Sequence, residues 1–168
     1  MPTAPSLNEQ EYQPVPADRP KSVDNAFLLW LIGAGISLLG VIFVLTVGVD
    51  AITDSARESL KNSGRPYTEE DVKNFANLSK IIGVVIGLLF VGLFVLFAYK
   101  MRAGRNWARI LLTVLGGLSL VFTLLGISST DGLTLVVRLI EAVLTLVAIY
   151  FMFRPEANRY FAAGRARR

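Results

Sequence analysis

Apolar residues are concentrated in four long runs, at residues 27–49, 81–99, 107–127 and 133–153. Each run is close to the ~20 residues that a helix needs to cross about 30 Å of hydrocarbon. No Asp, Glu, Lys or Arg interrupts the first two runs, the third contains only Arg109, and the fourth contains Arg138 and Glu141. The pattern predicts an all-α, polytopic integral membrane protein with four transmembrane helices spanning residues 26–154.

The composition agrees with this fold class, because 53% of the residues are hydrophobic and only 18% are charged. Soluble domains carry about 25% charged residues. The sequence has no cysteine and no histidine, which excludes disulfides, thiolate chemistry and the commonest metal ligand. It also has no glycine-rich phosphate loop and no catalytic triad in a plausible setting. We therefore expect a protein that is not an enzyme and that has no cofactor and no metal site.

The segments outside the four runs predict the orientation of the chain. Residues 1–25 hold five of the seven prolines and few large apolar side chains, a composition typical of a disordered tail. Eleven Lys and Arg residues lie in this tail, in the turn between the second and third runs with the nearby Arg109, and in the basic C-terminal tail (155–168 with Arg154), against five in the loop 50–80. The positive-inside rule then places both termini in the cytoplasm.

The loop 50–80 is predicted to form a helical hairpin on the outer surface. Ile52, Ala56 and Leu60 recur at helical spacing and would prolong the first span. The sequence 64–66 (Gly-Arg-Pro) breaks the helix, and 68–71 (Thr-Glu-Glu-Asp) resembles a capping box that opens the next one. The acidic residues of this loop alternate with Arg and Lys, so we expect a solvated charged face rather than a cation site.

A polar stripe on the fourth span is the strongest candidate for a site. At 100° per residue its members fall within about 100° of arc: Asp131, Thr134, Arg138, Glu141 and Thr145. Glu141 lies about 12 Å deep, and Arg138 is three residues away and can pair with it. One interpretation is a proton- or cation-linked site at Glu141. The other is a structural ion pair that fixes this helix against its neighbours or against another chain. We favour the ion pair because an adjacent arginine keeps the carboxylate charged.

Small residues form faces on the other spans, where they let backbones approach closely. They are Gly33, Ser37 and Gly40 on the first span, Gly83 and Gly87 on the second, and Gly116 on the third. We expect these faces to serve packing within the chain rather than dimerisation.

A basic turn precedes the third span and contains Lys100, Arg102, Arg105, Trp107 and Arg109. Gly104 permits a tight reversal, Asn106 can cap the helix, and Trp107 suits the headgroup region. Arg105 and Arg109 are one turn apart, so together they could reach a lipid phosphate. The turn is predicted to set topology and to contact lipid headgroups.

Two motifs resemble a family. The sequence 102–110 (Arg-Ala-Gly-Arg-Asn-Trp-Ala-Arg-Ile) and the sequence 154–161 (Arg-Pro-Glu-Ala-Asn-Arg-Tyr-Phe) are similar to those of small, uncharacterised actinobacterial membrane proteins with four spans. The resemblance covers most of the chain. It implies the topology and a bacterial plasma membrane, and it implies no reaction and no binding site.

The sequence favours a non-enzymatic membrane protein, working as an interaction or accessory subunit or as a self-assembling envelope component. Its expected partners are the lipid bilayer and a second copy or another membrane protein, and nucleic acid is not expected. The alternative is a small transporter or channel subunit that uses the polar stripe of the fourth span.

Overall fold

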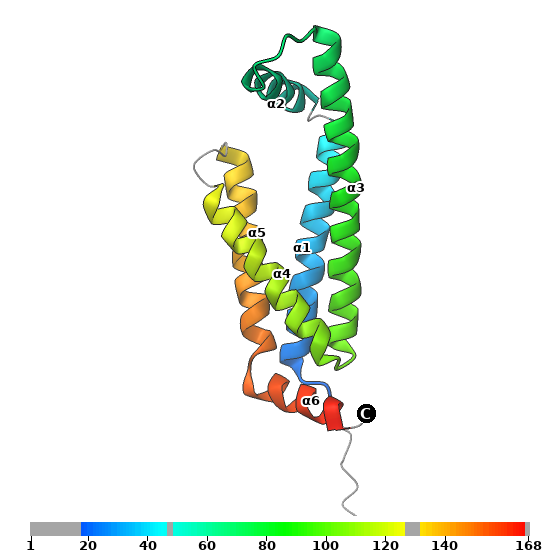
Figure 1. The fold of residues 1–168 in the computed structure, drawn as a ribbon. Coiled ribbons are helices and arrows are strands. Elements are labelled where there is room, and N and C mark those ends of the chain that lie inside the picture. The colour runs from blue at the N-terminus through cyan, green and yellow to red at the C-terminus, as the bar shows by residue number, and fades with distance from the viewer. Residues whose placement is uncertain (1–17, 47–48, 127–131, 167–168) are drawn as a thin grey trace, which may run out of the picture.

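The computed structural model describes residues 18–46, 49–126 and 132–166, and all the regular secondary structure in these ranges is α-helix. The helices are α1 (Lys21–Thr46), α2 (Val49–Asn62), α3 (Glu69–Arg102), α4 (Asn106–Leu125), α5 (Gly132–Met152) and α6 (Pro155–Ala166) (Figure 1). Four of them, α1, α3, α4 and α5, are long and apolar enough to cross a membrane. The predicted fold class is thereby confirmed for the described residues.

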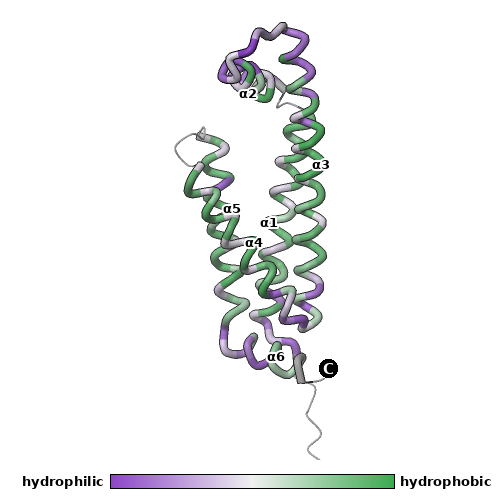
Figure 2. Tube along the Cα trace, viewed as in Figure 1, coloured by the Kyte–Doolittle hydropathy of each residue, from purple (hydrophilic) through white to green (hydrophobic). Residues whose placement is uncertain are grey.

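The four long helices form a bundle that is closed at one end and open at the other. Helix α1 packs along both α3 and α5, and α4 contacts α3 and α5. Near α2, the α4/α5 pair diverges from the α1/α3 pair (Figure 1). Apolar residues predominate along the long helices and polar ones gather at the two ends (Figure 2). Outward-facing side chains such as Leu89, Phe122 and Leu146 are more than half exposed, as a lipid-facing surface requires.

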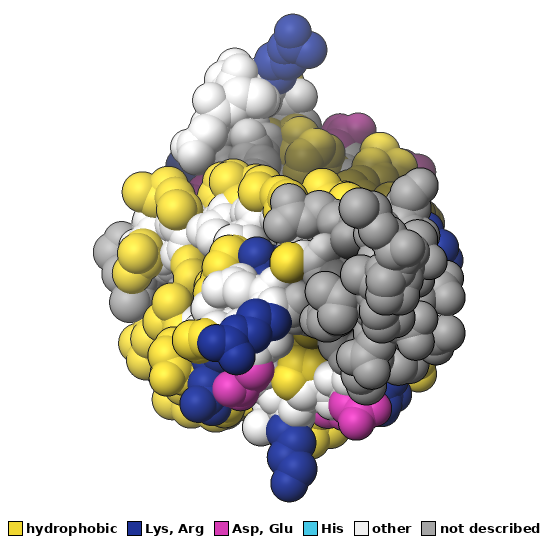
Figure 3. Space-filling model, turned by 90° about the horizontal axis from the view of Figure 1, so that it is seen from below, with side chains coloured by type: hydrophobic (Ala, Val, Ile, Leu, Met, Phe, Trp, Pro, Cys, Tyr) yellow, Lys and Arg dark blue, Asp and Glu magenta, His cyan; other side chains and the backbone are white. Residues whose placement is uncertain are grey.

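The main core lies at the closed end, where α6 runs across the bundle (Figure 1). All four long helices and α6 contribute buried residues to it: Val23, Ala26, Phe27, Trp30, Ala98, Met101, Ala108, Leu112, Ala148, Met152, Ala157 and Phe161. Seen from this end, Lys and Arg side chains stand among a few acidic ones, with apolar side chains on the flanks (Figure 3). The closed end therefore combines a packed interior with a basic surface.

Both ends of the chain are more helical than the sequence pattern predicts. Helix α1 begins at Lys21, so residues 21–25 belong to it and not to a disordered tail; residues 1–17 lie outside the described ranges. The expected C-terminal tail contains α6, with Pro155 in the first turn, where its missing N–H costs nothing. Packing explains both differences, because Val23, Ala157 and Phe161 are buried in the core.

The helical hairpin of the loop 50–80 is present, but its helices differ from the prediction. Helix α2 is a separate element whose Ala56 packs on Val72 and Ala76 of α3. The second helix of the hairpin and the second span are one continuous helix, α3. The capping box is confirmed, with the Thr68 hydroxyl accepting from the Asp71 N–H. The charged face is ion-paired, since the Arg57 guanidinium lies 2.9 Å from Glu69 and 3.5 Å from Asp54.

Candidate functional site

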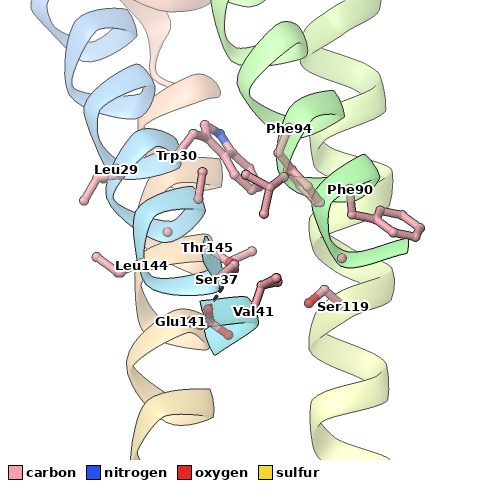
Figure 4. Close-up of a pocket in the computed structure, with 14 residues that line it drawn as sticks. Leu29, Trp30, Ser37, Val41, Phe90, Phe94, Ser119, Glu141, Leu144 and Thr145 are labelled. Atoms are coloured by element: carbon pink, nitrogen blue, oxygen red, sulfur yellow. Dashed lines mark hydrogen bonds between the residues drawn. The ribbon is translucent and has the colours of Figure 1, made fainter. Parts of the chain in front are cut away.

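A pocket of about 240 Å³ lies between α1, α3, α4 and α5. Its walls are mostly apolar and aromatic, and its polar side chains are Ser37 from α1, Ser119 from α4, and Glu141 and Thr145 from α5 (Figure 4). Small apolar-walled clefts with a few convergent polar groups are the usual form of a ligand site. This pocket is therefore the candidate functional site of the chain.

Glu141 is the charged group of the pocket. The Ser37 hydroxyl donates a hydrogen bond of 2.9 Å to its Oε1 atom, which links α1 to α5 across the bundle (Figure 4). In the described part of the chain this is the one hydrogen bond of the Glu141 side chain, which is half-buried. A carboxylate can accept about four hydrogen bonds, so the described residues leave most of its capacity unused.

Arg138 does not pair with Glu141 among the described contacts, in contrast to the expected ion pair. Its Nη1 atom instead lies near Gly126, where an added Cβ would approach it to 2.9 Å. Arg138 thus turns toward the open end of the bundle while Glu141 turns to Ser37. A long arginine side chain in hydrocarbon extends toward the nearer interface, which explains the divergence.

The rest of the predicted stripe is divided between two cavities. Thr145 lines the pocket with Glu141, one turn along α5. Thr134 lines a larger groove nearer to α2. Asp131 lies outside the described residues. The described residues of the stripe therefore share one face of α5 but do not form one site, because Thr134 lines the groove while Glu141 and Thr145 line the pocket.

The small residues of the predicted faces have two different roles in the structure, close packing and the lining of cavities. At Gly87 and Gly116, an added Cβ would lie 3.0 Å from Val41 and 2.8 Å from Trp30, so these glycines permit close packing as predicted. At Gly33, Gly40 and Gly83, nothing lies within 4 Å of an added Cβ. Gly33 lines the pocket, while Gly40 and Gly83 line the groove; here the small residues create space.

The aromatic wall of the pocket was not anticipated from the sequence. Trp30 is only 7% exposed, whereas its position near a span end suggests an interfacial ring. Its ring stacks on Phe94 at a centroid distance of 5.4 Å. Its indole N–H donates to the Met152 sulfur at 3.4 Å. The available clue was that Trp30 lies one turn before Gly33 and Ala34, so that it shares their face.

The pocket and the groove are arranged in series along the bundle. On α1, α3 and α5, the residues that line the groove lie about one turn from those that line the pocket, as for Gly83 and Gly87 or Val137 and Glu141. On the other side of the pocket, Trp30 belongs both to its wall and to the closed core. Among the α5 residues that line the pocket, Glu141 is the one nearest to the groove, whose lining on α5 ends one turn away at Val137.

The basic turn folds against α6. Arg109 donates from Nη1 to the Asn158 side chain at 2.8 Å and to the Met152 carbonyl at 3.3 Å. Its guanidinium also lies over the rings of Phe153 and Phe161, 4.5 and 4.8 Å from their centroids. Arg109 is therefore engaged within the chain, and not placed beside Arg105 for a lipid phosphate.

Arg102 is engaged in the same way. Its Nε atom donates to Asp24 of α1 at 2.9 Å, and its carbonyl accepts from the Tyr160 hydroxyl at 3.1 Å. Gly104 has φ +78° at the reversal of the chain, as its sequence position predicts. Arg105 and Trp107 are exposed and Lys100 is half-buried. The two motifs that carry the family resemblance thus pack on each other.

Comparison with protein-family models, with curated proteins and with solved structures finds no match to this chain. The resemblance to small actinobacterial membrane proteins therefore stays a prediction.

Proposed function

We propose that this chain is a non-enzymatic, multi-pass membrane protein that works as an accessory or self-assembling component of a membrane assembly. The observation that supports this most is the Glu141 carboxylate, which accepts one hydrogen bond from Ser37 within the described chain. A charged group at hydrocarbon depth is costly unless cationic or hydrogen-bonding partners surround it. A basic or hydroxyl side chain on a neighbouring transmembrane helix would supply the missing partners.

Access to the carboxylate supports the same proposal. Ser37 and Ser119, which share the pocket with Glu141, are both exposed. The apolar flanks of the long helices are also exposed, so a second membrane helix could pack beside the bundle. Interhelical hydrogen bonds and close packing are the interactions that drive helix association in lipid.

The test is co-purification from native membranes in mild detergent, quantified for the wild-type protein, Glu141→Gln and Glu58→Gln. Glu58 is an exposed carboxylate of α2 outside the pocket, so its variant is the matched control. We expect a near-stoichiometric partner, or a second copy, that is reduced about tenfold in Glu141→Gln and unchanged in the control, as for loss of one buried charged contact. Equal recovery in all three proteins would contradict the proposal.

A second candidate function is transport, with this chain as a small transporter or channel subunit. The observation that favours it is that the groove and the pocket follow one another along the bundle, with Glu141 at the groove side of the pocket and the packed core beyond Trp30. The carboxylate and the rings of Trp30 and Phe94 together suit an organic cation, which aromatic faces attract. The bundle would then carry the cation across the membrane by opening its two ends in turn.

Reconstitution in liposomes separates the two candidates. A transport role predicts uptake of a quaternary ammonium dye, or proton flux, that is abolished in Glu141→Gln and retained in Glu58→Gln. An accessory role predicts no flux from the isolated chain. Equal flux from the wild-type protein and both variants would exclude Glu141 as the transport site.

A further inference from the structure

A groove of about 950 Å³ lies beneath α2, where α5 diverges from the α1/α3 pair. Its deeper walls are apolar, with Leu39 and Phe43 from α1 and Leu133 and Val137 from α5. Its upper rim, formed by α2 and the adjoining part of α3, carries Ser55, Ser59, Ser79 and Lys80. The lining thus changes from cationic and hydroxyl-bearing at one end to hydrocarbon at the other. A ligand that matches it has an anionic head and an apolar tail.

Lys80 lies at the depth of a membrane surface. It is 19 residues before Tyr99 on the continuous helix α3, which at 1.5 Å per residue is about 28 Å. The hydrocarbon core of a bilayer is about 30 Å thick. When the exposed Tyr99 ring lies at one interface, where tyrosine is enriched, the Lys80 ammonium lies at the headgroups of the opposite leaflet. The apolar walls of the groove then lie in the acyl-chain region of that leaflet.

Lys80 is also held at the rim with donor capacity to spare. Its Nζ atom donates to the Leu45 carbonyl at 3.1 Å, near the end of α1. An ammonium has three N–H donors, and within the described residues this is its one hydrogen bond. The acidic side chains of α2 do not line the groove, and Asp54 is paired with Arg57. The charge at the rim is therefore positive.

We propose that this groove binds an anionic phospholipid, with the phosphate at Lys80 and one acyl chain along the apolar walls. The volume lies within the range of protein sites that enclose most of a small ligand, about 300–1,000 Å³. Lysine binds phosphate as a point charge, and the hydroxyl of Ser79, the residue before Lys80 in the groove lining, can donate to the same oxygens. The proposal does not rest on the proposed function, because it concerns the groove and not the Glu141 carboxylate.

The experiment uses the full-length protein in detergent with added phosphatidylglycerol or phosphatidylcholine, and native mass spectrometry counts the lipids that stay bound. We expect the wild-type protein to retain phosphatidylglycerol preferentially. Lys80→Gln should weaken its retention about fivefold, the usual effect of one basic residue on an anionic lipid. Lys73 lies about two turns before Lys80 on α3 and does not line the groove. Lys73→Gln should therefore change the retention of phosphatidylglycerol little. Lys80→Arg should restore retention.

A second pair of variants tests the apolar part of the groove. Nothing lies within 4 Å of a Cβ added at Gly83 or at Gly92, so the Cβ atom of a larger side chain meets no steric clash at either position. Gly83 lines the groove and Gly92 does not. Gly83→Leu should therefore displace the acyl chain and reduce retention at least about fivefold, as loss of several buried methylenes would, while Gly92→Leu should retain lipid like the wild type.

Three results would overturn the proposal. Equal retention of the two lipids by the wild-type protein would show that the groove does not select an anionic headgroup. Equal losses in Lys73→Gln and Lys80→Gln would indicate general attraction to a basic surface. Full retention in Gly83→Leu, with Gly92→Leu as the folded reference, would place the acyl chain elsewhere.

Discussion

Gly116 lies at a close approach of α4 to α1 and α5. A Cβ at this position would be 2.8 Å from Cη2 of Trp30 and 3.0 Å from Cγ2 of Thr145, and Trp30 is fixed in the core. We expect Gly116→Ala to lower the free energy of unfolding in detergent by about 1–3 kcal/mol, the usual cost of overpacking. Gly117→Ala is the matched control, since nothing lies within 4 Å of its Cβ and alanine favours a helix. Equal stability of the two variants would contradict the close approach.

The capping box at the start of α3 predicts a dependence on pH. Hydrogen bonds from the Thr68 backbone N–H and hydroxyl, at 2.8 and 2.7 Å, lower the pKa of Asp71 below its ordinary value. This residue lies outside the apolar run that begins at Ile81. Because the folded pKa is the lower one, the stabilisation is complete above the ordinary Asp pKa and is lost as the pH falls through the lowered pKa.

Amide hydrogen exchange of Asp71 and Val72, whose N–H groups donate to the Thr68 hydroxyl and carbonyl, measures this effect once it is corrected for its intrinsic pH dependence. We expect protection to be constant above about pH 5 and to fall below about pH 4. Asp71→Asn should remove the pH dependence. A variant that kept the same profile would show that another group titrates.

Local chemistry is the part of the residue scale that the sequence predicts best, but not throughout. The expected cap at Asn106 is wrong, because Arg105 is the N-cap of α4 and makes no side-chain capping hydrogen bond. The capping box follows from the spacing of Thr68 and Asp71 alone, and the reversal at Gly104 follows from a glycine in the short segment between two apolar runs. The directions of Arg138 and Glu141 could not be predicted in the same way. Their spacing permits a pair, but Ser37 on another helix and Gly126 at the end of α4 decide where each side chain goes.

At the scale of elements, hydrophobic runs predict where spans lie and not where helices end. A run ends at its last apolar residue, whereas the helix continues as long as its polar residues are capped or packed. Helix α3 therefore starts at Glu69, twelve residues before the predicted span, because Thr68 caps it. Helix α6 was missed because its buried face is short and rests on Ala157 and Phe161, too few apolar residues for a helical period.

The docking of α6 depends on Arg109 of α4, which contacts Asn158 and Phe161 of α6 and the ring of Phe153 in the turn before α6. We expect Arg109→Met to free α6, because the variant loses charge-assisted hydrogen bonds and two ring contacts. Amide exchange over residues 155–166 should become at least about tenfold faster. Arg105→Met changes an exposed arginine of the same turn and is the control. Unchanged exchange in Arg109→Met would show that apolar packing alone holds α6.

At the scale of the whole molecule, packing is unequal along the bundle. The closed end has a continuous core of five helices, while the end beneath α2 has the groove and the diverging helix pairs (Figure 1). The sequence could predict four helices of suitable length, because length and hydropathy are local properties. It could not predict this asymmetry, which depends on side chains from helices far apart in the chain, such as Trp30 and Met152.

The orientation of the bundle can be tested because the natural chain has no cysteine. Ser63→Cys, in the turn after α2, and Ala162→Cys, on α6, both introduce a thiol at an exposed position. Since the closed end carries most of the Lys and Arg residues, the positive-inside rule predicts that a membrane-impermeant maleimide labels position 63 on intact cells and position 162 only after permeabilisation. The opposite labelling pattern would show that the closed end of the bundle faces the outside and the α2 end faces the cytoplasm. The lipid at Lys80 would then belong to the inner leaflet, and Glu141 would open to the cytoplasm instead of the outside.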